Sequence, residues 1–227
     1  MERRKYKWLK VLIITTGVVL LLAAGGFLAL QYLKTELKAK LSSCTLENKS
    51  YMTVLDFDYV ADWIVVKVKI DGNDKEYPFI FDTGAQTVIS DSLLREIGTN
   101  NFSKMSSGMD DDSTKNAFKN EIITIKGLQI GGLKFHDIGA ITTINSEWGM
   151  LNCVSAFGVI GYNILNTCGF QIDYERKKII LTDQIGSLEN YDKIEWVSFT
   201  TPKNQETPII SAVINDSIKV SLFFDTG

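Results

Sequence analysis

The sequence has little of what most metal and hydrolytic sites need. It contains one histidine, His136, in 227 residues. A metal site with several histidines is therefore impossible, and a serine–histidine pair has no G-x-S-x-G motif to complete it. The charge is nearly balanced, with 24 basic against 27 acidic residues, so nothing points to a nucleic-acid partner. We expect no nucleic acid, no metal and no organic cofactor.

An acidic cluster and the three cysteines are each open to more than one interpretation. Asp110, Asp111 and Asp112 cluster carboxylates as calcium sites do, but no EF-hand spacing follows, which favours a solvated acidic loop. Of the three cysteines, Cys153 and Cys168 could pair in an exported domain or be two buried free thiols. Cys44 ends Leu41-Ser42-Ser43-Cys44, which looks like a lipoprotein cleavage box; charged residues separate it from the apolar run, so we read the match as chance.

One long apolar run lies near the N-terminus. Residues 11–30 form a stretch of 20 residues without a charge, long enough to cross about 30 Å of hydrocarbon. Five basic residues precede this run and three follow it: Arg3, Arg4, Lys5, Lys7 and Lys10, then Lys34, Lys38 and Lys40. The asymmetry favours a cytoplasmic segment 1–10, a transmembrane helix 11–32 and a stalk 33–50 that leads to an exported domain in the cell envelope or periplasm. A cleaved signal peptide is the alternative, although its apolar core is usually shorter.

From residue 51 the pattern is that of β-structure. Ile64, Val66, Val68 and Ile70 alternate with more polar neighbours, and a polar turn leads to a second alternating strand, 77–81. Residues 128–135 predict a hairpin around Gly131-Gly132, and residues 169–174 and 178–182 predict another. Only 91–97 and 162–167 look helical. We expect a mostly β lobe over residues 51–185.

Four residues occur twice, each time at the end of a predicted hairpin. Phe81-Asp82-Thr83-Gly84 recurs as Phe224-Asp225-Thr226-Gly227. The second copy follows alternating residues 210–214, a turn at 215–217 and a strand from 220 to 224. This repeat predicts a linker over 186–207 and the beginning of a second, truncated lobe over 208–227.

Two aspartates on such turns have a definite chemical use. An ionised carboxylate activates water while a protonated carboxyl polarises the amide carbonyl, and two carboxylates about 3 Å apart share one proton because both cannot ionise cheaply. Gly84 and Gly227 suit the sharp turns. Thr83 and Thr226 are short hydroxyl residues able to fix the two turns against each other.

Two motifs connect this lobe to a known family. Residues 79–85 read FIFDTGA, and residues 159–165 and 169–174 read VIGYNIL and GFQIDY. In these motifs and their order, residues 60–182 resemble the retropepsin-like aspartic peptidases, including bacterial exported members. The resemblance implies a closed β-barrel lobe with one or two short helices, preceded here by the transmembrane helix. It also implies a substrate-covering flap, for which residues 102–116 are the candidate.

The resemblance also assigns roles to single residues. Asp82 and Asp225 would be the catalytic carboxylates, and Thr83, Gly84, Thr226 and Gly227 would support them. Gln86 departs from the family, which usually has Ser or Thr after D-T-G-A, and this departure predicts the loss of a hydrogen bond to the catalytic carboxyl.

The leading hypothesis is a membrane-anchored aspartic endopeptidase acting on peptide or protein substrates. Three alternatives stay open: a homodimer that uses Asp82 of each subunit, an inactive peptide-binding module, and an envelope scaffold that docks partners. The sequence leaves the substrate and the pH optimum open.

Overall fold

The computed structural model describes residues 2–104, 121–143, 149–193, 195–201 and 207–227. The chain divides into two compact units, Met1–Lys40 and Leu41–Gly227. Each unit is described by itself below.

The first unit is formed by helix α1, which spans Glu2–Leu41. Its segment Lys10–Leu41 is long and apolar enough to cross a membrane, with a mean hydropathy of 2.5 in its most apolar window; a signal sequence would have the same character. The helix continues well past residue 32 because residues 31–40 are mostly good helix formers and include no proline or glycine.

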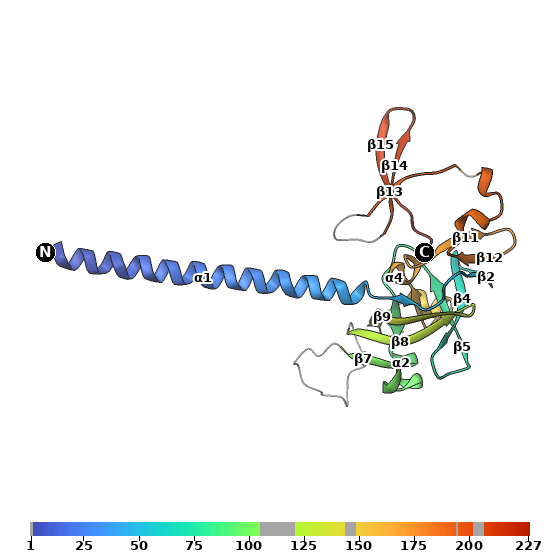
Figure 1. Cartoon of the computed structure of the whole chain (residues 1–227), viewed down its shortest axis with the longest axis horizontal. Helices are drawn as coiled ribbons and strands as arrows, with labels where there is room; N and C mark the ends of the chain where they lie inside the picture. Colours follow the sequence, from blue (N-terminus) through green and yellow to red (C-terminus); the bar gives the residue numbers. More distant parts are fainter. Residues whose placement is uncertain (1, 105–120, 144–148, 194, 202–206) are drawn as a thin grey trace. The chain divides into compact units, whose positions relative to one another are not determined.

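The second unit is built on a closed β-barrel (Figure 1). Its six strands pair in the circular order β9–β6–β10–β5–β4–β8, and β8 pairs again with β9. These strands are β4 (Trp63–Ile70), β5 (Glu76–Phe81), β6 (Val88–Ser90), β8 (Ile122–Ile130), β9 (Leu133–Thr143) and β10 (Gly158–Ile160). Three short strands pair at its margins: β1 (Thr45–Leu46), β3 (Asp58–Val60) and β7 (Phe102–Lys104). The predicted mostly β, closed-barrel fold is confirmed.

The barrel core follows the predicted alternation of side chains. On β4 the buried face carries Ile64, Val66, Val68 and Ile70, all almost fully buried, and on β5 it carries Tyr77, Phe79 and Phe81. Burying each large apolar side chain contributes roughly 1.5–3 kcal/mol. The opposite face of the same strands is also covered: Val65 and Ile80 pack with Leu151 and Val159 in a second apolar cluster.

A three-stranded sheet lies next to the barrel in the order β11–β12–β2, formed by β11 (Gly169–Asp173), β12 (Lys178–Thr182) and β2 (Met52–Asp56). The predicted hairpin of β11 and β12 is confirmed. Helix α2 (Asp91–Ile97) has the predicted bounds and begins at Ser90, whose hydroxyl accepts from the Leu93 amide at 3.2 Å. Helix α4 (Tyr162–Leu165) ends two residues earlier than predicted. Helix α3 (Gly149–Cys153) was not predicted. Short 3-10 turns are η1 (Thr99–Asn101), η2 (Ile185–Ser187) and η3 (Tyr191–Lys193).

The C-terminal residues form a separate antiparallel sheet in the order β13–β14–β15. The predicted hairpin is present as β14 (Ile209–Ile214) and β15 (Ile218–Phe223). Strand β13 covers Phe199–Thr200 and so lies within the predicted linker. Residues Glu195–Ser198 before it have no regular structure.

All three cysteines are free thiols. Cys153 is exposed, and Cys44 and Cys168 are partly buried against the barrel core. The pairing of Cys153 with Cys168 is therefore absent, and the alternative of two buried thiols is wrong for Cys153. That residue lies at the end of α3, a helix that the sequence pattern did not reveal.

Candidate active site

The first Asp-Thr-Gly turn is held by the second motif of the barrel. Strands β5 and β10 run parallel, with Ile160 opposite Phe81, and the Asp82 amide donates to the Ile160 carbonyl at 3.0 Å. The loop after Gly84 then crosses directly over Gly161, where an added Cβ would lie 2.3–2.4 Å from the loop backbone. Only glycine fits at that crossing, so the two motifs position each other.

Asp82 lies at the end of β5 in a nearly closed environment, with 7% of its surface exposed. The amides of Gly84 and Ala85 donate to its Oδ1 at 2.7 and 3.0 Å. Burial and the charge of the neighbouring Asp225 carboxyl raise the pKa of Asp82 to about 6, against the lowering effect of the two amides. A carboxyl of this kind can hold or release a proton in mildly acidic solution.

The two Asp-Thr-Gly turns bind each other through their threonines. The Thr83 hydroxyl donates to the Phe224 carbonyl at 2.9 Å and accepts from the Thr226 amide at 3.2 Å. The Thr226 hydroxyl donates to the Phe81 carbonyl at 3.2 Å and accepts from the Thr83 amide at 3.1 Å. We call these four hydrogen bonds the threonine grip. They join the end of β5 to the end of β15 with an approximate twofold symmetry.

The glycines of the two turns each face the opposite carboxyl. A Cβ on Gly84 would lie 2.5 Å from the Asp225 carboxyl carbon, and a Cβ on Gly227 would lie 2.5 Å from that of Asp82. Both positions therefore need glycine for the carboxyls to approach. The six predicted site residues all meet at this place, although the turns lie 143 residues apart in the sequence.

The comparisons with known proteins agree with this geometry. Residues 66–164, which include the first Asp-Thr-Gly turn and both barrel motifs as far as α4, match the family model described as aspartyl protease. In sequence, the barrel is therefore similar to the aspartyl proteases over these residues. No curated protein matches the chain.

Among solved structures, the crystal structure of basic 7S globulin from soybean is similar to this chain with a TM-score of 0.54. The two sequences are 9% identical, so this similarity concerns the fold alone. The match covers 72% of this chain and 58% of that chain. This chain thus matches less than two thirds of the soybean protein.

Asp82 and Asp225 differ in their surroundings. Asp82 is buried by the barrel, whereas Asp225 follows the largely exposed strand β15 and is itself exposed. Asp225 Oδ1 accepts from the Gly227 amide at 3.1 Å, which matches the bond from Gly84 to Asp82. The local turn is the same on both sides, and only the packing around it differs.

Gln86 stands where the family usually has Ser or Thr, and its side-chain amide is directed away from Asp82. Its Nε2 donates to the Leu41 carbonyl at 2.7 Å and to the Gly139 carbonyl at 3.3 Å. Both hydrogen bonds lead away from Asp82, whose Oδ1 accepts hydrogen bonds from backbone amides. Gln86 therefore ties the start of the second unit to strand β9. Sequence reasoning missed this role because Leu41 and Gly139 carry no pattern that marks them as partners.

Two further residues near the carboxyls were also missed. Trp63 begins β4, and its ring atom Cζ3 would lie 2.8 Å from a Cβ on Gly227. Thr207 precedes β14 and donates to the Gly84 carbonyl at 3.1 Å. Each residue lies at or just before the start of the first strand of a hairpin that leads to an aspartate. Aligning the two hairpins would therefore have drawn attention to both positions.

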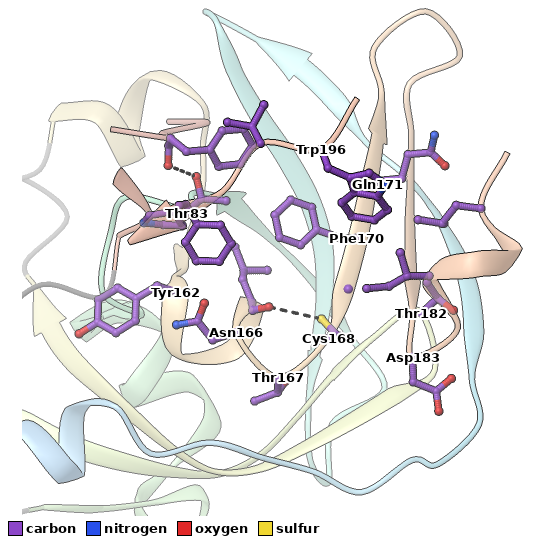
Figure 2. A pocket seen from close by; sticks show the side chains of 18 of the residues that line it. Thr83, Tyr162, Asn166, Thr167, Cys168, Phe170, Gln171, Thr182, Asp183 and Trp196 are labelled. Carbon is purple, nitrogen blue, oxygen red and sulfur yellow. Dashed lines mark hydrogen bonds between the residues drawn. The ribbon is translucent and has the colours of Figure 1, made fainter. Parts of the chain in front are cut away.

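A cavity of about 890 Å3 lies on the side of the threonine grip (Figure 2). Thr83 lines it, but neither aspartate does. Its walls are largely aromatic and aliphatic, including Phe170, Trp196 and Phe224, with amide side chains such as Asn166 among them. The cavity is therefore distinct from the space in which the two carboxyls meet.

Two predictions lie partly or wholly outside the described residues. Of the flap candidate 102–116, only Phe102–Lys104 are described, and they form β7; Asp110, Asp111 and Asp112 lie in the part that is not. Within the described ranges, no group of three or more histidine, cysteine and acidic side chains could hold a metal ion.

Proposed function

We propose that the chain is a membrane-anchored aspartic endopeptidase whose catalytic pair is Asp82 and Asp225 of one molecule. The observation that carries the proposal is the threonine grip, which joins the two Asp-Thr-Gly turns and places each carboxyl against the glycine of the opposite turn. The aspartyl protease domain supplies the reaction class: hydrolysis of a peptide bond.

The pair would work through one shared proton. The ionised carboxyl takes a proton from a water molecule as the water oxygen attacks the scissile carbonyl carbon, and the protonated carboxyl gives its proton to the carbonyl oxygen. In the resulting tetrahedral diol, the newly protonated carboxyl gives its proton to the amide nitrogen and the carbon–nitrogen bond breaks. The other carboxylate takes a proton from one hydroxyl as the new carboxylic acid forms, which returns the pair to its starting state. The raised pKa of Asp82, about 6, keeps one proton on the pair in mildly acidic solution.

The other site residues would hold the pair in place. The amides of Gly84 and Ala85 orient the Asp82 carboxylate, and the glycines leave space for the opposite carboxyl. Fixed donors and a rigid backbone lower the cost of reaching the transition state because little rearrangement is needed during the reaction.

The arrangement favours a pair within one chain over a pair of Asp82 residues from two subunits. Asp225 already occupies the space that faces Gly84, and Thr226 already provides both reciprocal bonds to Thr83. A second copy of the first turn would have to displace the whole C-terminal hairpin. We accordingly propose that residues 208–227 begin a second lobe, with 186–207 as the linker.

Helix α1 supports membrane attachment by its length and apolar character. We propose that it remains attached as an anchor, with residues 1–10 cytoplasmic and the protease domain exported, since the basic residues are more numerous before the apolar run than after it. The substrates would then be peptides or proteins in the cell envelope or periplasm.

The test is cleavage of a peptide library by the full chain in detergent micelles, from roughly pH 3 to pH 8. The proposal expects cleavage that disappears in Asp82→Asn and resists metal chelators. A peptide that binds equally to the wild type and to Asp82→Asn, with no cleavage at any pH in this range, would instead identify an inactive peptide-binding module.

A further inference from the structure

Thr207 is a buried polar residue that belongs neither to the aspartate pair nor to the threonine grip. Its exposed fraction is 7%, and its hydroxyl donates to the Gly84 carbonyl at 3.1 Å. The residue stands just before β14, so this bond joins the C-terminal sheet to the catalytic turn at a point beyond the grip.

The bonded carbonyl belongs to the same peptide group that supports Asp82. The Gly84 carbonyl and the Ala85 amide form one planar unit, and the Ala85 amide donates to Asp82 Oδ1 at 3.0 Å. A hydrogen bond at the carbonyl end fixes the orientation of this plane, and it polarises the amide end toward the carboxylate. The Thr207 hydroxyl thus acts on Asp82 through a single rigid group.

The strand register shows that Thr207 has a counterpart. Continuing the pairing of Ile209 with Phe223 places Thr207 opposite Asp225, and the bond from the Phe224 amide to the Pro208 carbonyl at 2.9 Å supports this extension. In the first hairpin, the pairing of Val65 with Ile80 places Trp63 opposite Asp82 in the same way.

The two equivalent positions carry different chemistry. Thr207 reaches the glycine of the first turn with a hydroxyl, whereas Trp63 reaches the glycine of the second turn with an aromatic ring. An indole ring carbon offers no comparable donor to the backbone. The hydroxyl therefore reinforces the support of Asp82 specifically.

We propose that Thr207 is a positioning residue that holds the Gly84–Ala85 peptide group in the orientation that binds the Asp82 carboxylate. The proposal deepens the proposed function and rests on it for its catalytic consequence. Loss of the hydroxyl frees the peptide group, weakens the Ala85 bond to the ionised carboxyl and so favours the protonated form of Asp82.

The test compares Thr207→Val, which keeps the shape and removes the hydroxyl, with Thr207→Ser, which keeps the hydroxyl. Aspartate carboxyl carbons are labelled in the full chain in micelles and titrated by NMR, and the Asp82 signal is identified by its loss in Asp82→Asn. Asp225 is the charged group that faces Asp82, so the comparison is repeated in Asp225→Asn to separate its influence.

We expect Thr207→Val to raise the titration midpoint of Asp82 by roughly half a pH unit and Thr207→Ser to restore the wild-type midpoint. The acidic limb of the cleavage profile moves in the same direction. If Thr207→Val does not fold, Thr207→Ala takes its place. The proposal is overturned if the Asp82 midpoint is unchanged when the Thr207 hydroxyl is removed. It is also overturned if Asp82 titrates in Thr207→Ser as it does in Thr207→Val.

The titration of Asp82 can be measured whether or not the chain cleaves peptides. The role of Thr207 and the proposed function are therefore tested by different results. A wild-type chain that never cleaves a peptide overturns the proposed function, while the Asp82 midpoint still shows whether Thr207 acts on it. If the wild-type chain cleaves peptides but the Asp82 midpoint is the same in Thr207→Val as in the wild type, only the positioning role of Thr207 is overturned.

Discussion

Thr83 and Thr226 are joined by reciprocal hydrogen bonds. Each threonine hydroxyl accepts a hydrogen bond from the backbone amide of the other threonine, and it donates one to the carbonyl of the residue two positions before that threonine. These four reciprocal bonds link the barrel to the C-terminal hairpin. They predict that Thr226→Val, which loses the hydroxyl and both of its bonds, loosens the hairpin by about 1–3 kcal/mol. Amide exchange in β15 measures the effect.

Two matched variants make that prediction specific. Thr226→Ser keeps the hydroxyl and should retain most of the protection of β15, and Thr45→Val removes a hydroxyl from an exposed strand position and should change nothing there. Equal exchange rates in Thr226→Val and the wild type would show that the grip does not hold the hairpin.

Gly84→Ala tests the close approach of the carboxyls. The added methyl group would collide with the Asp225 side chain, which is exposed and able to turn away, so we expect a small change in stability and at least a tenfold loss of kcat/KM, equivalent to about 1.4 kcal/mol. Gly186→Ala is the control, since a methyl group there meets nothing within 4 Å. Unchanged cleavage by Gly84→Ala would mean that the carboxyls do not need this proximity.

The raised pKa of Asp82 predicts how stability depends on pH. Its folded-state pKa is about 6 against an ordinary value of 3.8, so the folded chain binds the proton more tightly than the unfolded chain, and stability falls as pH rises between these values. Asp82→Asn removes this penalty. We expect it to be more stable than the wild type near pH 7.5 by on the order of 1–2 kcal/mol, with no difference below about pH 4.

Urea unfolding of the full chain in micelles at both pH values measures this difference. Asp192→Asn, at an exposed position in η3, should unfold like the wild type at each pH. An Asp82→Asn variant that is less stable than the wild type near pH 7.5 would contradict the buried, proton-binding carboxyl.

Gln86→Ala tests the link between the catalytic loop and the start of the second unit. The substitution removes the donors to the Leu41 and Gly139 carbonyls, and we expect it to cost about 1–3 kcal/mol and to speed amide exchange in residues 41–44. The titration of Asp82 should stay as in the wild type, because the bonds of Gln86 lead away from it. A shifted Asp82 midpoint in Gln86→Ala would show that Gln86 supports the carboxyl after all.

The parts of this fold that the sequence predicted are those with local patterns. The alternation in β4 and β5, the Gly131-Gly132 turn and the bounds of α2 all follow from periodicity or turn chemistry within about ten residues. Helix α3 was missed because five residues give too little periodicity. The parallel pairing of β5 with β10 joins segments far apart in the chain, and no local pattern in the sequence marks it.

The residues of the candidate site also fall into those that the sequence predicts and those that it does not. Asp82, Asp225 and their neighbours could be predicted because four residues recur in order. Aligning the two hairpins marks the positions of Trp63 and Thr207, but it does not give their roles. Those roles, like the contacts of Gln86, depend on strand register and on which backbone carbonyl comes within reach after folding. Such roles follow from three-dimensional placement and leave no motif in the sequence.

The central claim is that one chain supplies both carboxyls, and cleavage by Asp225→Asn tests it most directly. The amide keeps the size of the carboxyl but cannot share the proton in the same way. The account predicts that Asp225→Asn, checked for folding by its barrel stability, loses cleavage as completely as Asp82→Asn does. Wild-type rates in Asp225→Asn together with inactive Asp82→Asn would contradict it, and would assign the pair to Asp82 of two subunits.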